Sequence, residues 1–368
     1  MKLAILGNTP ELSALELGAK WEGGQVAEVE GELELAKLGG TVKLAEVVGK
    51  CARSLAGLEQ LLGLLKTVPT DHKLVFGFSV YAADDTVTSA VVKQYAKQLL
   101  NTGLAWKKQL RTEDRPVRFV VSEEPALSSV IVHKEHLLRD QTDFVLAVHA
   151  KTIVLARTSA VQDYRGFSDR DFGRPQRDHF SGMLPPKVAR MMINIAHPKA
   201  TDTVLDPFCG SGTVVQEALA LGFKEVIGSD ISKKCIADTK ANIEWAKLPA
   251  AKLLCCDVLE LQNQLPARSI DVVVGEGYLG PVQPDQVTNV HQQLTKFYNA
   301  VFPALQPLLK PGARVVLAVP SWKRHNGLLE LPLDAAAGQA GFKQFHRPIF
   351  YGREQARVVR KILFLEQA

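Results

Sequence analysis

A strand, a glycine-containing turn and a helix follow one another without a break over residues 203–218. The β-branched and apolar start predicts a strand that ends at Asp206, and helix-forming residues begin at Thr213, which is expected to cap the helix. Gly210 and Gly212 lie in the turn, where glycine permits positive φ and lets the backbone approach a ligand closely. Since open α/β sheets bind ligands at the carboxyl ends of their strands, this stretch predicts a ligand-binding loop.

Three successive predicted strands end in an aspartate, at Asp206, Asp230 and Asp257. Any one of these acids alone could be a turn or helix-cap residue, but three in series favour a binding site. The glycine spacing fits neither the P-loop nor the dinucleotide fingerprint. An acid before the loop would repel a phosphate but suits the ammonium and sulfonium of S-adenosylmethionine, and Asp230 follows at about the distance expected of a ribose acceptor. The predicted cofactor-binding residues are Asp206, Phe208, Gly210, Gly212, Thr213, Asp230, Ile231, Asp257 and Val258.

The chain resembles the class I, S-adenosylmethionine-dependent methyltransferases, and more narrowly the THUMP-domain tRNA guanine-N2 methyltransferases that modify position 10. The resemblance rests on Asp206–Thr213, on Gly173–Pro175 followed by Leu184–Arg190, and on Leu6–Ser13. It is most specific over residues 170–230. It implies a Rossmann-like methyltransferase domain preceded by ferredoxin-like and THUMP-like α/β domains, with S-adenosylmethionine as cofactor and tRNA as partner.

The length of 368 residues exceeds one ordinary domain. We expect a ferredoxin-like domain at 1–67, a THUMP-like RNA-binding domain at 68–158, an arginine-rich linker at 159–182 and the methyltransferase domain at 183–368. The strands and helices after residue 183 predict a seven-stranded sheet that ends in an antiparallel hairpin of residues 342–350 and 357–365.

Three local patterns give further structural expectations. The alternation of Glu32–Leu35 has the period of a half-buried strand. A helix is predicted over residues 87–102 and should end at Gly103, since glycine is a common helix terminator. A second helix is predicted over residues 328–340.

Composition limits the class of protein. With 46% apolar and 23% charged residues the chain can bury real cores, and a net charge of +5 permits a polyanionic partner without requiring one. The five cysteines form no C-x-x-C pair, which indicates reduced, mostly buried thiols in a cytoplasmic protein without structural zinc or another metal. No segment approaches 18 uninterrupted apolar residues, so no membrane span is expected.

Two basic stretches are candidates for contact with RNA. Arginines, aromatics and glycines mix over residues 163–178, and arginine forks with aromatic faces suit phosphate and splayed bases. A basic patch in the THUMP-like part comprises Lys107, Lys108, Arg111, Arg115 and Arg118. The alternatives are a solvated charged face for the patch and a linker with internal Arg–Asp pairs for the other stretch. The predicted RNA-binding residues are Lys107, Lys108, Arg165, Arg170, Arg174 and Arg177.

The catalytic position is expected directly after the fourth methyltransferase strand. Exocyclic-amine methyltransferases carry an acid or amide, two prolines and an aromatic there, and this side chain and the first proline carbonyl accept the amine hydrogens. Alignment of the amine is then the main requirement of the reaction. The run from Gly275 to Pro281 loses both prolines. One alignment frame makes Glu276 the acid and leaves Gly277 at the first proline, with less backbone order; the other aligns Tyr278 with the aromatic but puts Gly275 at the acid.

We prefer the first frame because it retains a carboxylate, and we predict Glu276 and Tyr278 as the catalytic residues. Three hypotheses stay open at this point. The chain is an RNA guanine-N2 methyltransferase, an amino-methyltransferase that acts on adenine or cytosine of RNA or DNA, or a non-catalytic homologue that binds cofactor and RNA. The predicted front domains argue against a DNA enzyme.

Overall fold

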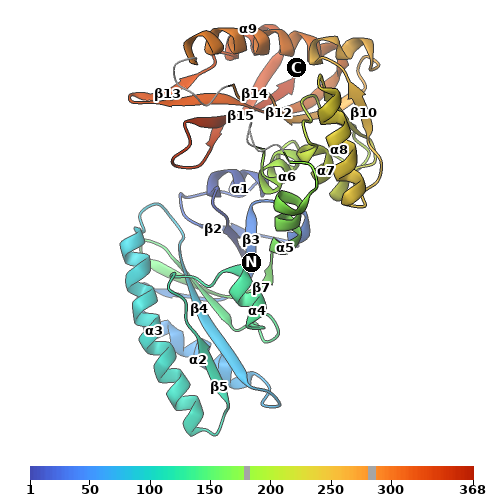
Figure 1. Cartoon of the computed structure of the whole chain (residues 1–368). Helices are drawn as coiled ribbons and strands as arrows, with labels where there is room; N and C mark the ends of the chain where they lie inside the picture. The colour runs from blue at the N-terminus through green and yellow to red at the C-terminus, as the bar shows by residue number, and fades with distance from the viewer. Residues whose placement is uncertain (178–182, 281–286) are drawn as a thin grey trace. The chain divides into compact units, whose positions relative to one another are not determined.

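The computed structural model describes residues 1–177, 183–280 and 287–368, which form two compact units of residues 1–165 and 166–368 (Figure 1). Each unit contains one large sheet with helices packed on it. This confirms the predicted α/β fold class, with a Rossmann-like unit following an α/β unit.

The first unit is built on a seven-stranded sheet of order β2-β1-β3-β7-β6-β4-β5, in which β4 runs parallel to β5 and β6 and the other neighbours are antiparallel. Its strands are β1 (Lys2–Leu6), β2 (Val26–Val29), β3 (Thr41–Ala52), β4 (Leu74–Ala82), β5 (Val117–Val120), β6 (Asp143–Val148) and β7 (Thr152–Val161). Its helices are α1 (Pro10–Glu16), η1 (Leu35–Lys37), η2 (Leu55–Leu58), α2 (Glu59–Thr67), α3 (Ser89–Thr112) and α4 (Ser129–Lys134), with α5 (Tyr164–Ser168) at the junction of the units.

This sheet crosses the domain boundary expected between residues 67 and 68. β3 lies before that boundary and pairs with β7, which lies after it, from Lys43 opposite Val161 to Ala52 opposite Thr152. Because β3 finds its hydrogen-bond partners in β7, the two halves share one sheet instead of closing separately. The structure therefore differs from the predicted division into 1–67 and 68–158.

The alternation of Glu32–Leu35 does not form a strand. Instead η1 begins at Leu35, and the turn places Leu35 and Leu38 in the same buried cluster. Their spacing of three residues matches the period of a 3₁₀ turn, and four alternating residues were too short a pattern to establish a strand.

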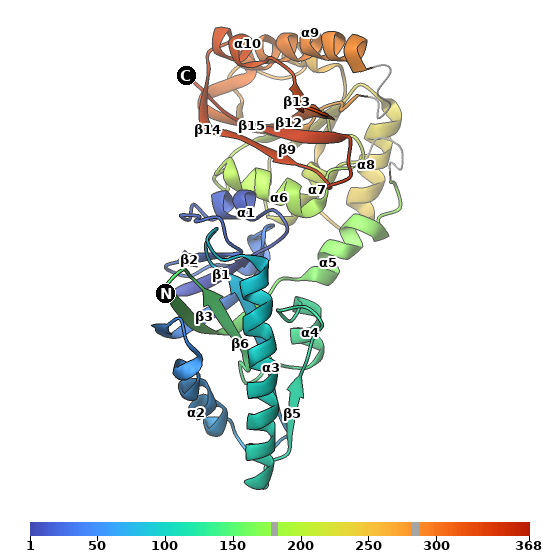
Figure 2. The same cartoon turned by 90° about the vertical axis from the view of Figure 1, so that its left-hand side faces the viewer.

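Helix α3 continues past Gly103, where it was expected to end. Figure 2 shows α3 as one long, unbroken helix. A Cβ atom at residue 103 would overlap the Phe119 ring, so glycine permits close packing of the helix on β5. Phe119 in turn stacks on Phe76, with ring centroids 5.0 Å apart, and Trp106 of α3 lies beside Phe78. The glycine is a packing residue and not a terminator.

The second unit has an eight-stranded sheet of order β10-β9-β8-β11-β12-β15-β14, with β13 paired to β12. Its strands are β8 (Val204–Asp206), β9 (Val226–Asp230), β10 (Lys252–Cys255), β11 (Ile270–Glu276), β12 (Leu309–Arg324), β13 (Gly327–Glu330), β14 (Phe342–Tyr351) and β15 (Val358–Gln367). Its helices are η3 (Asp169–Gly173, π-helical), α6 (Pro186–Ile195), α7 (Thr213–Ala220), α8 (Lys233–Trp245), η4 (Val258–Asn263), α9 (Val287–Leu305), η6 (Gln306–Leu308) and α10 (Asp334–Gln339).

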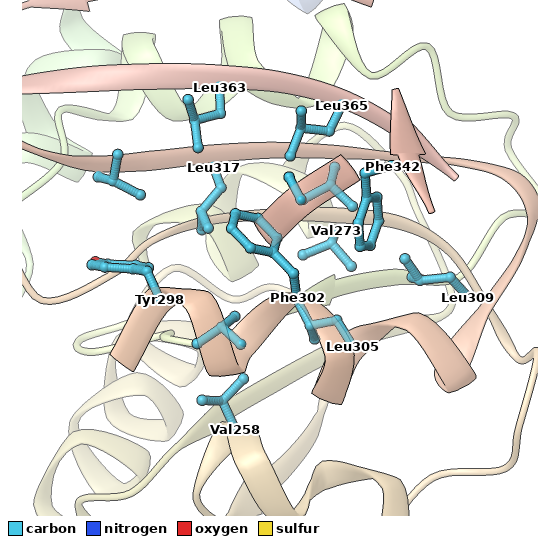
Figure 3. Packing of buried hydrophobic residues seen from close by; sticks show 14 of the residues in the cluster. Val258, Val273, Tyr298, Phe302, Leu305, Leu309, Leu317, Phe342, Leu363 and Leu365 are labelled. Carbon is cyan, nitrogen blue, oxygen red and sulfur yellow. The ribbon is translucent and has the colours of Figure 1, made fainter. Parts of the chain in front are cut away.

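The five strands β8 to β12 are parallel, and β15 runs antiparallel between β12 and β14, as the sequence predicts. Helix α9 covers one face of this sheet, and α6 and α7 cover the other (Figure 1). The core under α9 joins Phe302 and Leu305 to Val273 and Leu317 of the sheet (Figure 3). This packing holds the carboxyl ends of the parallel strands at one edge.

Two expectations for this unit need correction. The helix predicted over 328–340 is shorter, because residues 327–330 form β13, which returns along β12 after a turn at Gly327 (φ +124°). The predicted linker is also more regular than expected. Residues 159–161 belong to β7, and α5 and η3 follow, while residues 178–182 lie outside the described part of the chain.

Candidate active site

A cavity of about 430 Å³ opens at the carboxyl ends of β8, β9, β10 and β11. The predicted residues that line it are Asp206, Phe208, Gly210, Thr213, Asp230, Ile231, Asp257, Val258, Glu276 and Tyr278. Lining residues that the sequence analysis missed include Met183, Leu184, Ser211, Cys235, Gly277 and Phe297. The series of acid-ended strands thus converges on one site.

The glycine loop has the backbone that its sequence predicts. Gly210 and Gly212 both have positive φ, +53° and +87°. A Cβ atom at Gly212 would lie 2.7 Å from Thr239 Cγ2, so this glycine serves packing against α8 and does not line the cavity. Gly212 is also the N-cap of α7, which corrects the prediction for Thr213. The Thr213 hydroxyl instead accepts a hydrogen bond from Arg174 Nη1 at 2.7 Å.

Helix α8 holds the loop from outside through two buried polar side chains. Thr239 Oγ1 donates to the Gly210 carbonyl at 2.8 Å, and Asn242 Nδ2 donates to the Ser211 carbonyl at 2.8 Å. Asn242 also exchanges hydrogen bonds with the backbone of Gln176. In the sequence, Thr239 and Asn242 are only two polar residues three positions apart on a predicted helix. Such a pair is typical of a solvent-exposed helix face, so the sequence does not predict their contact with the loop.

Asp206 is buried at the bottom of the site. Its Oδ1 accepts the Phe208 backbone N–H at 3.1 Å, and a Cβ atom at Gly275 would lie only 2.7 Å from this oxygen. Burial raises the pKa of Asp206 well above its ordinary value, and the nearby acids Asp230 and Glu276 raise it further against the Phe208 hydrogen bond. Such a buried acidic cluster favours a ligand that brings positive charge.

Asp230 and Asp257 are oriented by backbone N–H groups. The Asp230 carboxylate accepts Gly210 N at 3.0 Å and Ser232 N at 2.9 Å, one on each oxygen. Asp257 Oδ1 accepts Leu259 N at 3.0 Å as the cap of η4. Each carboxylate oxygen has two acceptor sites, so both groups retain capacity toward the cavity. Ile231 beside them is 71% exposed, an apolar side chain at the cavity wall.

Glu276 ends β11 and forms a two-point ion pair with Arg360 of β15. Arg360 Nε donates to Glu276 Oε2, and Arg360 Nη2 lies 3.3 Å from Oε1. Burial raises the pKa of Glu276, and the Arg360 charge and its hydrogen bond oppose the increase. The sequence analysis missed Arg360, which is 84 residues away and reaches Glu276 only because β12 and β15 extend the sheet beyond β11.

The backbone after Glu276 is ordered without proline. Gly277 N donates to the Ala318 carbonyl at 3.1 Å, and the buried Tyr298 hydroxyl donates to the Tyr278 carbonyl at 3.1 Å. A Cβ atom at residue 277 would overlap that hydroxyl, so Tyr298 accounts for the glycine. The order expected to be lost with proline is supplied by these two hydrogen bonds. The Tyr278 side chain is 59% exposed, and Pro281 lies outside the described residues.

Two of the predicted RNA-binding arginines bind other residues of the second unit. Arg174 is buried and bonded to Thr213, as described above. Arg170 Nε lies 2.5 Å from Glu217 Oε1, and Arg190 Nη2 lies 2.6 Å from Glu217 Oε2. Burial lowers the pKa of Arg174. Both side chains connect the segment to the core of the second unit. This corrects the assignment of the buried Arg174 to RNA, whereas for the half-buried Arg170 a contact with RNA stays a prediction.

The other predicted RNA-binding side chains are more accessible. Arg165 and Lys108 are exposed, and Lys107 and Arg177 are half-buried. Within the wider basic patch, Arg115 is buried and donates to the carbonyls of Leu65, Val68 and Pro69, so it is a structural residue. A contact of the accessible group with RNA stays a prediction.

The cysteines are less buried than expected, since Cys209 is buried, Cys255 exposed and the other three half-buried. All five are free thiols. In residues 1–177, 183–280 and 287–368, no three His, Cys, Asp or Glu side chains are grouped to hold a metal ion. No helix in these ranges is long and apolar enough to cross a membrane.

Comparison with known proteins gives two matching family models. A model described as RMKL-like, methyltransferase domain matches residues 174–335, and a model described as DNA methylase matches residues 90–241. The first range contains every predicted cofactor-binding and catalytic residue.

The chain is 22% identical over 273 residues to a tRNA (guanine(10)-N2)-dimethyltransferase of Methanothermobacter thermautotrophicus, covering 73% of this chain and 77% of that one. It is 32% identical over 134 residues to the enzyme of the same name from Methanocaldococcus jannaschii, covering 34% of this chain and 38% of the relative. Among solved structures, TrmN from Thermus thermophilus matches with a TM-score of 0.55 and 18% identity over 100% of this chain and 99% of that chain.

The structural match supports the fold, and the sequence matches support the narrower resemblance. Together with the strand order and the acid-lined cavity, they confirm the relationship predicted from the sequence. These matches support a resemblance of the chain to the THUMP-type tRNA guanine-N2 family of S-adenosylmethionine-dependent methyltransferases.

Proposed function

We propose that this protein transfers a methyl group from S-adenosylmethionine to the N2 exocyclic amine of a guanosine in tRNA. The observation that supports the proposal is that Glu276 lines the same cavity as Asp206, Asp230 and Asp257. A carboxylate at the end of the fourth parallel strand is thereby placed beside a site suited to a cationic cofactor. The names of the relatives supply the base and the class of RNA.

The residues present fit the cofactor. Asp230 would accept hydrogen bonds from the ribose hydroxyls, and Asp257 from the adenine amine, since both carboxylates are fixed by backbone N–H groups but retain acceptor capacity. The exposed Ile231 offers an apolar contact for the adenine ring. Asp206 and the glycine loop would hold the amino-acid end, where the buried acid complements its ammonium.

S-Adenosylmethionine, when bound, supplies a methyl group on a sulfonium that an amine nitrogen can attack. The protein's task is to present that nitrogen in the correct orientation. Glu276 would accept a hydrogen bond from one N2 hydrogen, and the Gly277 carbonyl would accept the other, which directs the nitrogen lone pair toward the methyl group. The exposed ring of Tyr278 provides a face on which the guanine can stack.

The structure supports the alignment frame that makes Glu276 the acid. A Cβ atom at Gly275 would lie only 2.7 Å from Asp206 Oδ1, so this position has no room for a side chain. Glu276, Gly277 and Tyr278 all line the cavity. Arg360 adds a further function in this proposal, because it fixes the carboxylate by two contacts and favours its ionised, hydrogen-bond-accepting form.

The test is an incorporation assay with nucleoside analysis. Tritiated S-adenosylmethionine is incubated with unmodified total tRNA and the full-length protein, and the nucleosides are separated and identified by mass spectrometry. We expect label in N2-methylguanosine. Label in N6-methyladenosine or N4-methylcytidine would instead favour an amino-methyltransferase of another base, the candidate to which the DNA methylase match points. Binding of cofactor and tRNA without any label would identify a non-catalytic homologue.

The raised pKa of Glu276 predicts how activity depends on pH. The ionised carboxylate accepts the amine hydrogen more strongly than the protonated acid, so kcat should rise with pH through the Glu276 pKa, at a pH above the ordinary range of a glutamate. The raised pKa of Asp206 affects a different constant, because its ionisation changes cofactor affinity. Measuring kcat at saturating cofactor and tRNA from pH 4.5 upward separates the two. The residual kcat of Glu276→Gln should not show this rise with pH. An unchanged rise in that variant would show that another group titrates.

A further inference from the structure

Two hairpins of the second unit meet beside the catalytic end of the sheet. β12 ends with Lys323 and Arg324 before its turn into β13, and the connection from β14 to β15 carries Arg353 and Arg357. These four side chains are exposed, and we call them the hairpin surface. Figure 1 shows the connection between β14 and β15 projecting from the sheet.

Hydrogen bonds between the hairpins make the hairpin surface a single structure. Lys323 N donates to the Arg357 carbonyl at 2.8 Å, which continues the pairing of β12 with β15. Lys323 Nζ donates to the carbonyls of Glu354 at 2.5 Å and Arg353 at 3.3 Å. The four basic residues are therefore held in one region, although 34 positions of sequence separate Lys323 from Arg357.

The charge of this region is strongly unbalanced. Residues 323–326 and 352–357 contain these four Lys and Arg residues and one acid, Glu354. On the neighbouring β13, the charge of Glu330 is matched by Lys361, whose Nζ lies 2.7 Å from its carboxylate. A cluster of exposed Lys and Arg side chains with a single acidic neighbour attracts phosphate groups electrostatically.

The hairpin surface is connected to the proposed catalytic residue through β15. Arg360 lies three residues after Arg357, and its guanidinium contacts Glu276 in the cavity wall. Tyr351 ends β14 on the same side, with the Arg360 guanidinium 5.8 Å from its ring centroid. Basic side chains outside the cavity could bind the RNA backbone, while Glu276 inside the cavity contacts a nucleobase that enters it.

We propose that the hairpin surface binds RNA phosphates that flank the methylated nucleotide. This inference rests on the proposed function, because it places the contact next to the base that reacts. It adds an RNA-binding site on the methyltransferase unit to the one expected on the front unit. The arginine forks can bind phosphate oxygens in a bidentate manner, and Lys323 holds the two hairpins together.

The test uses the full-length protein with Arg324→Ala, Arg353→Ala and Arg357→Ala combined, which leaves the loop-holding Lys323 in place. The matched control is Lys224→Ala, Lys240→Ala and Lys252→Ala, which removes the same charge from exposed positions of the second unit outside the cavity lining. Binding of unmodified tRNA is measured by fluorescence anisotropy over a series of salt concentrations, and cofactor binding by calorimetry.

We expect the triple arginine variant to bind tRNA at least tenfold more weakly, with the slope of log affinity against log salt reduced by about 2, since each phosphate contact contributes roughly 0.7–0.9. Its cofactor affinity should stay unchanged, and the lysine control should bind like the wild type. Equal tRNA affinity and salt slope in the arginine variant and the wild type would overturn the proposal, as would an equal loss in the lysine control. Because the readout is binding, a wild type that binds tRNA but methylates no guanosine would contradict the proposed function alone.

Discussion

Replacing Lys43 with methionine is expected to lower the free energy of unfolding by about 3–5 kcal/mol. Lys43 and Asp143 are both completely buried in the first unit, with Lys43 Nζ 2.8 Å from Asp143 Oδ2. Asp143 also accepts hydrogen bonds from Ser79 Oγ at 2.7 Å and Thr158 Oγ1 at 2.6 Å. Removing the ammonium would leave a buried carboxylate without its counter-charge, which is among the most destabilising changes a core can suffer.

Urea denaturation of the full-length protein, followed by circular dichroism, measures this effect. The control is Lys37→Met, which removes an exposed lysine paired with Glu34 and should change stability by less than about 1 kcal/mol. The double variant Lys43→Met with Asp143→Leu should recover much of the loss, because no unpaired charge remains. If Lys43→Met lowers the free energy of unfolding no more than Lys37→Met does, the Lys43–Asp143 ion pair does not stabilise the first unit as predicted.

The sequence was most informative where structure is determined by near neighbours. The turn from Asp206 to Gly212 is local, and its positive φ values at two glycines follow from the residue types themselves. The acids at the ends of β8, β9 and β10 converge because parallel strands end at one edge of the sheet. The fold class and most residues that line this cavity could therefore be predicted without any contact being known.

Long-range pairing was not predictable from those patterns. An arginine in an irregular segment looks the same whether it faces solvent or a buried threonine, so Arg174 was assigned to RNA although it holds Thr213. The pairing of β3 with β7 joins two stretches that look like separate domains. Arg360 is adjacent to Glu276 only through the order of the three strands β11, β12 and β15.

Gly277 shows how a departure from a family pattern can be compensated by a distant residue. Replacing a proline by glycine predicts a looser backbone when only the motif is considered. In the structure, Tyr298 of α9 fills the space where a side chain would be and binds the Tyr278 carbonyl. Burial raises the pKa of Tyr298, so its hydroxyl stays protonated and remains a hydrogen-bond donor. The backbone of residues 277 and 278 is therefore fixed by hydrogen bonds to Ala318 and Tyr298, and the proposed orientation of an amine requires such order.

On this basis, Glu276→Ala is expected to lower kcat for guanosine methylation by roughly 100-fold or more, because the amine loses the acceptor that orients it. Cofactor affinity should change little, since Asp230, Asp257 and the glycine loop are untouched. Glu276→Gln keeps the shape and one acceptor oxygen, so its loss should be smaller. The tritium incorporation assay gives kcat, and calorimetry with S-adenosylmethionine gives the cofactor affinity.

The matched control is Glu366→Ala, which removes another β15-region ion pair, with Arg314 Nε 3.2 Å from Glu366 Oε2, but lies outside the cavity lining. This pair is partly exposed, so its loss should affect stability by about 0–1 kcal/mol and leave kcat unchanged. A Glu276→Ala variant that binds cofactor and tRNA but turns over at the control's rate would show that Glu276 is not the acceptor. The second alignment frame would then also fail, because Gly275 has no side chain, and orientation of the amine would have to come from main-chain carbonyls alone.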